Sequence, residues 1–305
     1  MSKMDLAPAL AGVIAIPVTP FGADGQVDEA AYRRIVLRLV EGGVGVVTPN
    51  GNTGEFYALT EKETRRNVEL SVAAARGHGV GVLAGVGYDL ERAVEAARHA
   101  VRAGADGVMI HQPLHPHLHQ EGWIEYHRRI ASSIAEVPVV LYLRDARIRG
   151  EHLARLADQA PNLAGVKYAL PDPARFAAVI RDAGLERLTW IAGLAEPYAP
   201  SAFVSGATGF TSGLANVAPE LSVHMLQALR AGDYQSAMTV WDRIRPFEDL
   251  RAENGSANNV AVVKEALSQL GLCRPDVRPP ACRLDEEDRA RVTRILGSWD
   301  LAATP

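Results

Sequence analysis

The chain has 305 residues, of which 48% are hydrophobic, and a formal net charge of −4, as expected of a folded protein with a large core in one domain or two. The acidic balance argues against a nucleic-acid partner, which requires a basic surface, and no apolar run approaches the roughly 20 residues of a membrane span. The opening MSKMDLAPALAGVIAI lacks the features of a secretory signal, so we expect a cytoplasmic location.

Eight short segments rich in β-branched residues recur along the chain, and most are too continuously apolar to be half-exposed strands. They cover residues 12–18, 43–50, 79–87, 107–113, 137–144, 163–169, 188–194 and 206–212. The amphipathic segments between them are typical of helices, with residues 28–43, 60–77, 89–107, 121–136, 150–160 and 172–184 as the clearest cases. The second of these begins Thr60-Glu61-Lys62-Glu63, which is the pattern of a capping box.

Eight strands alternating with helices predict an α/β fold, a (β/α)8 TIM barrel, which typically fills about 250 residues. We assign residues 1–215 to the barrel. Residues 216–305 contain further helical patterns, and we expect them to form a helical C-terminal extension packed on the barrel as one structural unit. A doubly wound open sheet is the alternative, but the chain shows no Gly-x-Gly-x-x-Gly turn between a strand and a helix.

Three chemically capable groups are predicted at the same end of this barrel. Lys167, one of only four lysines, lies near the end of the sixth strand in LAGVKYA, and Tyr142 lies near the end of the fifth. The loop GNTGE (51–55) follows the second strand. Active sites of TIM barrels gather at the C-terminal ends of the strands, so we expect the three to lie close together.

These groups suit one kind of chemistry. Burial lowers the pKa of a lysine amine, and a neutral amine can form a Schiff base with a ketone. A tyrosine hydroxyl can carry protons, and the N–H groups of a glycine-rich loop can hold a carboxylate. The three together predict Schiff-base chemistry on a 2-oxo acid without metal or other cofactor, because the iminium is itself the electron sink. The alternative for Lys167 alone is a strand lysine whose ammonium reaches water.

Seven motifs in order resemble the family of dihydrodipicolinate synthase and N-acetylneuraminate lyase, the pyruvate-type class I aldolases. The resemblance runs from about residue 12 to about residue 297. It implies a TIM barrel with a helical extension and, for most members, a homotetramer. The motifs are PVTPF (17–21), GNTGEFYALT (51–60), AGADGVMI (103–110), YLRD (142–145), GVK (165–167), GFTSGLANVAP (209–219) and VRPP (277–280).

The resemblance also implies roles for individual residues. Lys167 corresponds to the Schiff-base lysine and Tyr142 to the proton-handling tyrosine. Thr53 and Asn52, in the loop bounded by Gly51 and Gly54, then hold the carboxylate of the 2-oxo acid.

The chain departs from the synthases at several of these positions. Asn52 replaces the threonine that relays protons, and His115 aligns with a tyrosine lent by a neighbouring subunit. Arg147 aligns with the arginine that holds a second carboxylate, and Arg144 competes for that role. After Gly193 the usual acidic residue, which would recognise a substrate hydroxyl, is missing.

GNTGEF and the Y-x-R-D pattern of YLRD look closer to the branch containing 5-dehydro-4-deoxyglucarate dehydratase, which uses the imine to expel water and carbon dioxide. We therefore predict a lyase, an aldolase or dehydratase, acting on a small 2-oxo acid of the sugar-acid class. Three alternatives stay open: a dihydrodipicolinate synthase proper, a degenerate barrel that only binds a 2-oxo acid, and a phosphate- or nucleotide-binding barrel enzyme.

Other motifs favour no additional site. His111, His115, His117 and His119 lie at mixed spacing in one loop, which fits a pocket or an interface better than a metal site. Cys273 and Cys282 match neither a disulfide framework nor a zinc pattern. The glycines of GVGVLAGVG (79–87) lie within a predicted strand, where small residues ease barrel packing.

Overall fold

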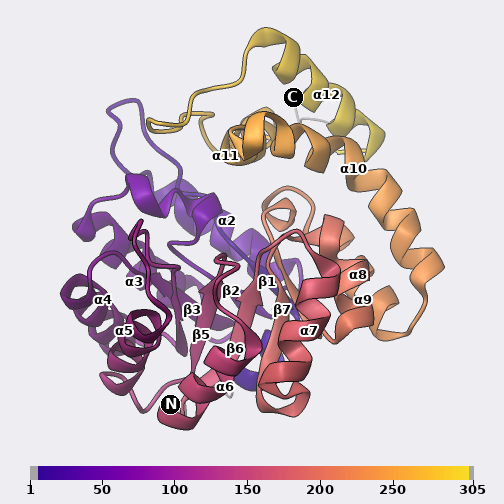
Figure 1. Ribbon diagram of the computed structural model, residues 1–305. Coiled ribbons are helices and arrows are strands. Elements are labelled where there is room, and N and C mark those ends of the chain that lie inside the picture. The colour runs from indigo at the N-terminus through magenta and orange to yellow at the C-terminus, as the bar shows by residue number, and fades with distance from the viewer. Residues whose placement is uncertain (1–5, 302–305) are drawn as a thin grey trace.

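The computed structural model describes residues 6–301. Its eight strands are parallel and close in chain order, each pairing with the next and β8 pairing with β1, so the predicted TIM barrel is confirmed (Figure 1). The strands are shorter than the predicted segments, because each segment includes the turns that enter and leave the strand. They are β1 Val13–Ala15, β2 Val46–Val47, β3 Gly81–Val86, β4 Gly107–Ile110, β5 Val139–Leu143, β6 Leu163–Tyr168, β7 Thr189–Ala192 and β8 Gly209–Ser212.

Helices surround the barrel, and side-chain caps fix where several of them begin. Asp28, Asp89 and Asp172 each accept a hydrogen bond from a backbone N–H in the first turn. The predicted capping box of Thr60 and Glu63 is confirmed. The helices are α2 Glu29–Glu41, α3 Glu61–Ala75, α4 Leu90–Ala103, α5 Gln120–Ser132, α6 Gly150–Gln159, α7 Pro173–Ala183, α8 Ala199–Ser205 and α9 Pro219–Arg230.

A short helix that the sequence pattern did not predict, α1 (Leu6–Leu10), contacts β1 and β7. Leu6 and Leu10 are buried in the same cluster as inward-facing residues of the strands, among them Ile14, Val46 and Leu83. Hydrophobic side chains therefore fill the end of the barrel opposite the C-terminal ends of the strands.

The predicted helices after the barrel are α9, α10 (Tyr234–Ser256), α11 (Asn259–Gln269) and α12 (Glu286–Ser298). In Figure 1, α11 and α12 lie over one end of the barrel near α2. The boundary proposed at residue 215 falls within the short helix η5 (Leu214–Asn216), which contacts α2, α9 and α11; the division into two parts stays a prediction. Within residues 6–301, no helix has both the length and the apolar character needed to cross a membrane.

The barrel register brings the two candidate catalytic side chains together. Tyr142 on β5 pairs with Lys167 on β6, and Lys167 pairs in turn with Ile191 on β7. Residues in register on parallel strands point to the same face of the sheet. Because Tyr142 and Ile191 belong to the cluster inside the barrel, Lys167 also points inward.

Candidate active site

Lys167 lies against the ring of Tyr142, as the sequence predicted for their positions. Its Nζ atom is 4.2 Å from the ring centre, and the residue is 3% exposed. Burial lowers the pKa of the Lys167 amine to about 7, and the positive charge of Arg144 adds to the effect. Near neutral pH a large share of the amine is therefore unprotonated and able to act as a nucleophile.

The stem of Lys167 needs the glycine at position 193. A Cβ atom at Gly193 would lie 2.9 Å from Cγ of Lys167 and 2.6 Å from the carbonyl oxygen of Tyr168. Any larger residue would push the lysine stem aside. Gly193 thus lies in direct contact with the candidate nucleophile, and its contribution is space rather than a hydrogen bond.

The loop after β2 folds into two short 3-10 turns, η1 (Asn52–Gly54) and η2 (Phe56–Ala58). Within it, Nδ2 of Asn52 donates a hydrogen bond to the hydroxyl oxygen of Tyr142 over 3.1 Å. Thr53 is buried at 4% exposure. The loop, Tyr142 and Lys167 therefore form one cluster at the C-terminal end of the barrel.

The two glycines of the loop are required by close packing. A Cβ atom at Gly51 would lie 2.6 Å from Cγ2 of Ile16, and one at Gly54 would lie 2.9 Å from the carbonyl oxygen of Pro17. Both contacts are with the chain that leaves β1. The glycines thus let the loop pack closely against the segment that follows β1, and this packing fixes the position of Asn52 and Thr53.

A buried ion pair that the sequence analysis missed ties this loop to the C-terminal helices. Glu55 has a positive φ of 60°, and its carboxylate pairs with Lys264 of α11, which is 0% exposed. The backbone N–H of Arg278 donates to the same carboxylate over 2.9 Å. The signal available in the sequence was the placement of one of four lysines in the apolar stretch VAVVKEAL.

Of the two competing arginines, the structure brings Arg144 to the site. Its guanidinium carbon is 5.9 Å from the ring centre of Tyr142. Both arginines are exposed, but Arg147 pairs with Asp145 over 2.6 Å and donates to the carbonyl oxygen of Leu118. Arg144 is therefore the better candidate for a second carboxylate of the substrate.

His115 is not brought to the site within the described chain. It is exposed, and its Nδ1 accepts a hydrogen bond from the backbone N–H of His117. The first acidic residue after Gly193 is Glu196, which is fully buried and accepts a hydrogen bond from Ser222 of α9. Among residues 6–301, no group of three or more His, Cys, Asp or Glu side chains is placed to hold a metal ion.

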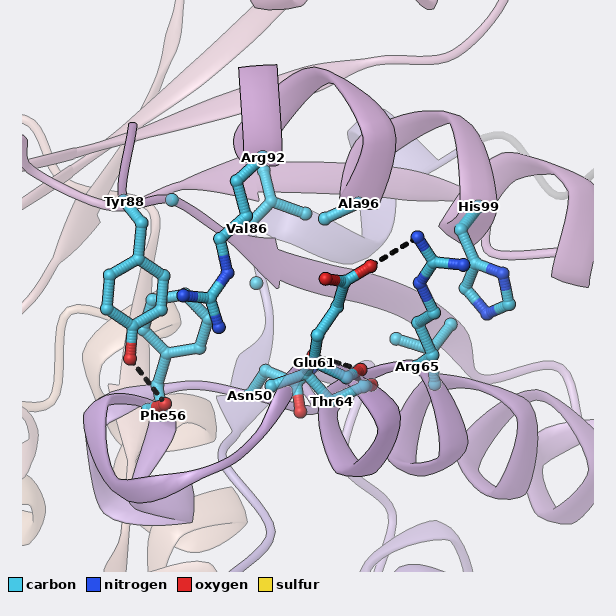
Figure 2. A pocket seen from close by; sticks show the side chains of 13 residues that line it. Asn50, Phe56, Glu61, Thr64, Arg65, Val86, Tyr88, Arg92, Ala96 and His99 are labelled. Carbon is cyan, nitrogen blue, oxygen red and sulfur yellow. Dashed lines mark hydrogen bonds and ion pairs between the residues drawn. The ribbon is translucent and has the colours of Figure 1, made fainter. Parts of the chain in front are cut away.

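A small pocket lies outside the candidate site, between α3 and α4 (Figure 2). It is lined by Asn50 and Phe56 from the loop region and by Arg65, Arg92 and His99 from the helices. Its volume of about 20 Å³ is enough for one water molecule. Lys167 and Tyr142 are not among the residues that line it, so it is separate from the cluster described above.

Comparisons with known proteins identify the family of the chain. The model of the Dihydrodipicolinate synthetase family matches residues 9–298. The chain belongs to this family. A solved dihydrodipicolinate synthase from Bacillus clausii superimposes with a TM-score of 0.93 at 42% identity, covering 97% of this chain and 100% of that one.

Two relatives show that the family contains more than one activity. A probable 5-dehydro-4-deoxyglucarate dehydratase of Bradyrhizobium diazoefficiens is 34% identical, covering 97% of this chain and 96% of that protein. A 4-hydroxy-tetrahydrodipicolinate synthase of Phenylobacterium zucineum is 36% identical, covering 95% of this chain and 97% of that protein. This member of the dihydrodipicolinate synthetase family is therefore an enzyme of the class I aldolase type.

Proposed function

We propose that the protein is a Schiff-base lyase, an aldolase or dehydratase, that acts on a 2-oxo acid of the sugar-acid class, with Lys167 as the imine-forming residue. The observation that carries the proposal is the buried Lys167 amine, 4.2 Å from the ring centre of Tyr142, whose pKa is lowered to about 7. A lysine with a structural role alone would not need an amine that is partly unprotonated near neutral pH.

In the proposed mechanism the neutral Lys167 amine attacks the 2-oxo carbon, and loss of water from the adduct gives a protonated imine. The iminium then accepts the electron pair released when a neighbouring bond breaks. Tyr142 transfers protons during imine formation and bond cleavage. Water finally hydrolyses the imine, which releases the product and restores the amine.

The loop and Arg144 bind the substrate in this scheme. The N–H groups of Asn52 and Thr53, at the start of a 3-10 turn, and the Thr53 hydroxyl hold the carboxylate next to the oxo group. Arg144 holds a second carboxylate at the far end of the substrate, since a guanidinium matches a carboxylate in a bidentate manner. Gly193 leaves room for the stem of Lys167.

The sugar-acid class is favoured by the contacts around Tyr142. The Asn52 amide occupies the place of a hydroxyl relay and can hydrogen-bond substrate hydroxyls instead, and a site built for hydroxyls strongly rejects analogues that lack them. The similarity to the probable dehydratases supports the same class. A homotetramer and a cytoplasmic location are part of this proposal.

Trapping with borohydride tests the imine. Reduction in the presence of pyruvate should add one pyruvyl-derived mass to the intact protein, and peptide mapping should place it on Lys167. Lys167→Ala should abolish the adduct, while Lys62→Ala, which removes an exposed lysine of α3, should not. An adduct on Lys264 or on any other amine would refute the assignment.

Parallel assays test the substrate class. Purified protein would be incubated with 5-dehydro-4-deoxyglucarate and with 2-oxo-3-deoxy sugar acids, and separately with pyruvate plus aspartate semialdehyde. Turnover of a sugar acid supports the proposal. Condensation with the semialdehyde alone would make the protein a dihydrodipicolinate synthase, and trapping without any turnover would indicate a barrel that only binds 2-oxo acids.

A further inference from the structure

His111, one of the four histidines between positions 111 and 119, is part of the barrel interior. It follows β4 directly, and its backbone N–H donates to the carbonyl oxygen of Val86 over 2.8 Å, so it continues the pairing of β4 with β3. Met109, two residues earlier, lies in the cluster inside the barrel, and side chains two apart on a strand share a face. His111 is accordingly 1% exposed.

The hydrogen bond of His111 defines its protonation state. Nε2 lies 2.8 Å from the carbonyl oxygen of Asn50, and a carbonyl only accepts, so Nε2 carries the hydrogen and donates. Burial lowers the pKa of the imidazole to about 3, and the charges of Lys167 and Arg144 act in the same direction. His111 is therefore a neutral donor near neutral pH.

This imidazole contacts both ends of the loop that carries Asn52 and Thr53. At one end it donates to Asn50, whose φ of 62° is a conformation that residues other than glycine seldom adopt. At the other end its ring stacks on Phe56, with centres 4.2 Å apart and planes 6° apart. Segment 50–56 is thus held between two contacts with one side chain.

Further contacts hold the same two ends from the side of α3 and of the chain between β3 and α4. The hydroxyl of Tyr88 donates to the carbonyl oxygen of Phe56 over 3.1 Å, which Figure 2 shows. The side-chain amide of Asn50 donates to the carbonyl oxygen of Thr64 over 2.9 Å. His111 supplies the corresponding contacts from the barrel side.

The sequence provides the space that this arrangement needs. A Cβ atom at Gly85 would lie 3.0 Å from Nε2 of His111, and one at Gly87 would lie 3.0 Å from its Cβ and 3.3 Å from the Phe56 ring. Both glycines belong to the run GVGVLAGVG. They leave room for the imidazole beside β3.

We propose that His111 is a positioning residue: its neutral imidazole fixes segment 50–56 so that Asn52 and Thr53 face the carboxylate of the 2-oxo acid. The inference rests on the proposed function for the identity of that ligand. Without the Nε2 donor, the buried carbonyl oxygen of Asn50 loses its hydrogen-bond partner. The peptide group between Asn50 and Gly51 can then reorient. The carboxylate-binding groups then adopt several orientations.

His127 provides a matched control. It is also fully buried, its Nδ1 lies 2.7 Å from the carbonyl oxygen of Trp123, and burial lowers its pKa to about 4. It lies on α5, on the outer side of the barrel, and its ring centre is 4.0 Å from that of Trp123 with the planes tilted by 41°. A role in folding alone is expected for His127, so it separates general core effects from loop positioning.

The test compares His111→Phe, which keeps the stacking ring but not the donor, with His111→Gln, whose amide nitrogen reaches the place of Nε2. The first readout is the pyruvate concentration that gives half-maximal borohydride trapping. His111→Phe should raise it about tenfold to a hundredfold, since small displacements of binding groups have effects of this size. Trapping at saturating pyruvate should still occur at Lys167, and His111→Gln should restore most of the affinity.

The second readout needs no ligand. Hydrogen exchange of the backbone amides in residues 50–58 should be faster in His111→Phe than in the unmodified protein and close to normal in His111→Gln. His127→Phe should lower the melting temperature without changing either readout. If the unmodified protein forms no adduct with pyruvate, the proposed function fails, and the exchange comparison alone decides the role of His111.

An unchanged half-saturating concentration or unchanged exchange in His111→Phe would overturn the inference. If His111→Phe does not fold, His111→Asn replaces it, because its shorter side chain cannot reach the carbonyl of Asn50 while His111→Gln can. Equal pyruvate affinity of the Asn and Gln variants would then overturn it.

Discussion

The side-chain amide of Asn52 donates a hydrogen bond to the hydroxyl oxygen of Tyr142 over 3.1 Å. The phenol oxygen is the acceptor, so the hydroxyl hydrogen of Tyr142 points to a different group. The Lys167 amine lies 4.2 Å from the centre of the same ring. Asn52 therefore orients the tyrosine, and in the proposed mechanism Tyr142 is the group that exchanges a proton with the chemistry at Lys167.

Tyr142→Phe should reduce kcat by about 10²–10⁴, the usual contribution of a positioned proton-transfer group. KM should change little, because the ring still packs against Lys167. Steady-state kinetics with the best substrate checks this. A near-normal kcat with a raised KM would instead make Tyr142 a binding residue.

Tyr168→Phe is the control for that variant. Tyr168 is the next residue of β6 after Lys167, but its ring stacks on Phe176 with centres 4.7 Å apart, on the outer side of the barrel. Removal of its hydroxyl should leave kcat unchanged.

The rate of imine formation should rise with pH through about 7 and then level off. Burial lowers the pKa of Lys167 to about 7, and only the amine without its extra proton attacks a carbonyl. Initial rates of borohydride trapping at saturating pyruvate, measured from about pH 5.5 to 9, give the profile. A profile that rises only near the ordinary lysine pKa would contradict the burial effect.

Arg144→Gln should move this profile to higher pH. The positive charge of Arg144 disfavours protonated Lys167, so its removal raises the pKa of the amine and lowers the rate near pH 7. Arg147→Gln removes an equal charge that is paired with Asp145 at the surface, and the profile should stay in place. A shift of equal size in both variants would mean that net charge, rather than proximity, sets the pKa.

Gly85→Ala should weaken the binding of 2-oxo acids. The new Cβ atom would lie 3.0 Å from Nε2 of His111 and press on the carbonyl of Asn50, so the loop must shift. We expect a loss of stability of about 1–3 kcal/mol from overpacking and a raised half-saturating pyruvate concentration.

Gly122→Ala is its control, since a Cβ atom at this position in α5 has no neighbour within 4 Å. Alanine in a helix is favoured over glycine by up to about 1 kcal/mol, so this variant should be slightly more stable and bind pyruvate normally. Unchanged pyruvate binding in Gly85→Ala would show that the loop tolerates the displacement.

Lys264→Met should destabilise the protein by about 3–5 kcal/mol, because it leaves the buried carboxylate of Glu55 without its partner. The double variant Lys264→Met with Glu55→Gln removes the unpaired charge and should recover part of the loss. Chemical denaturation gives the free energy of unfolding for each. Arg66→Met, which breaks half-exposed pairs with Glu29 and Glu69, should cost no more than about 1 kcal/mol.

Much of the fold could be predicted because the barrel imposes a simple pattern. A strand covered on both faces is continuously apolar, and a helix on its outside is amphipathic, so the eight segments and the helices between them were visible in the sequence. The five-residue helix α1 was not, since Leu6–Leu10 is too short to show a helical period. Its function in filling the barrel depends on contacts with strands distant in the chain.

Some features of the candidate site could likewise be predicted from the sequence, and others could not. Lys167 and Tyr142 could be found because a strand end places them, and their pairing in the structure follows from register. The choice between Arg144 and Arg147 could not be made, because it depends on the salt bridge with Asp145. The partners of Glu55 and of His111 are also set by long-range contacts: Lys264 is 209 positions from Glu55, and Asn50 is 61 positions from His111.

The ion pair between Glu55 and Lys264 limits which parts of the chain can be exchanged between relatives. Glu55 of the loop after β2 and Lys264 of α11, beyond the barrel, neutralise each other's charge in a buried position. A hybrid protein could take the residues before α9 from one relative and the remainder from another. Its buried charges stay paired only if the first part supplies the carboxylate and the second part supplies the amine. The two segments are therefore expected to be inherited together, and exchange of the C-terminal helices alone should disturb the distant loop that carries Asn52 and Thr53.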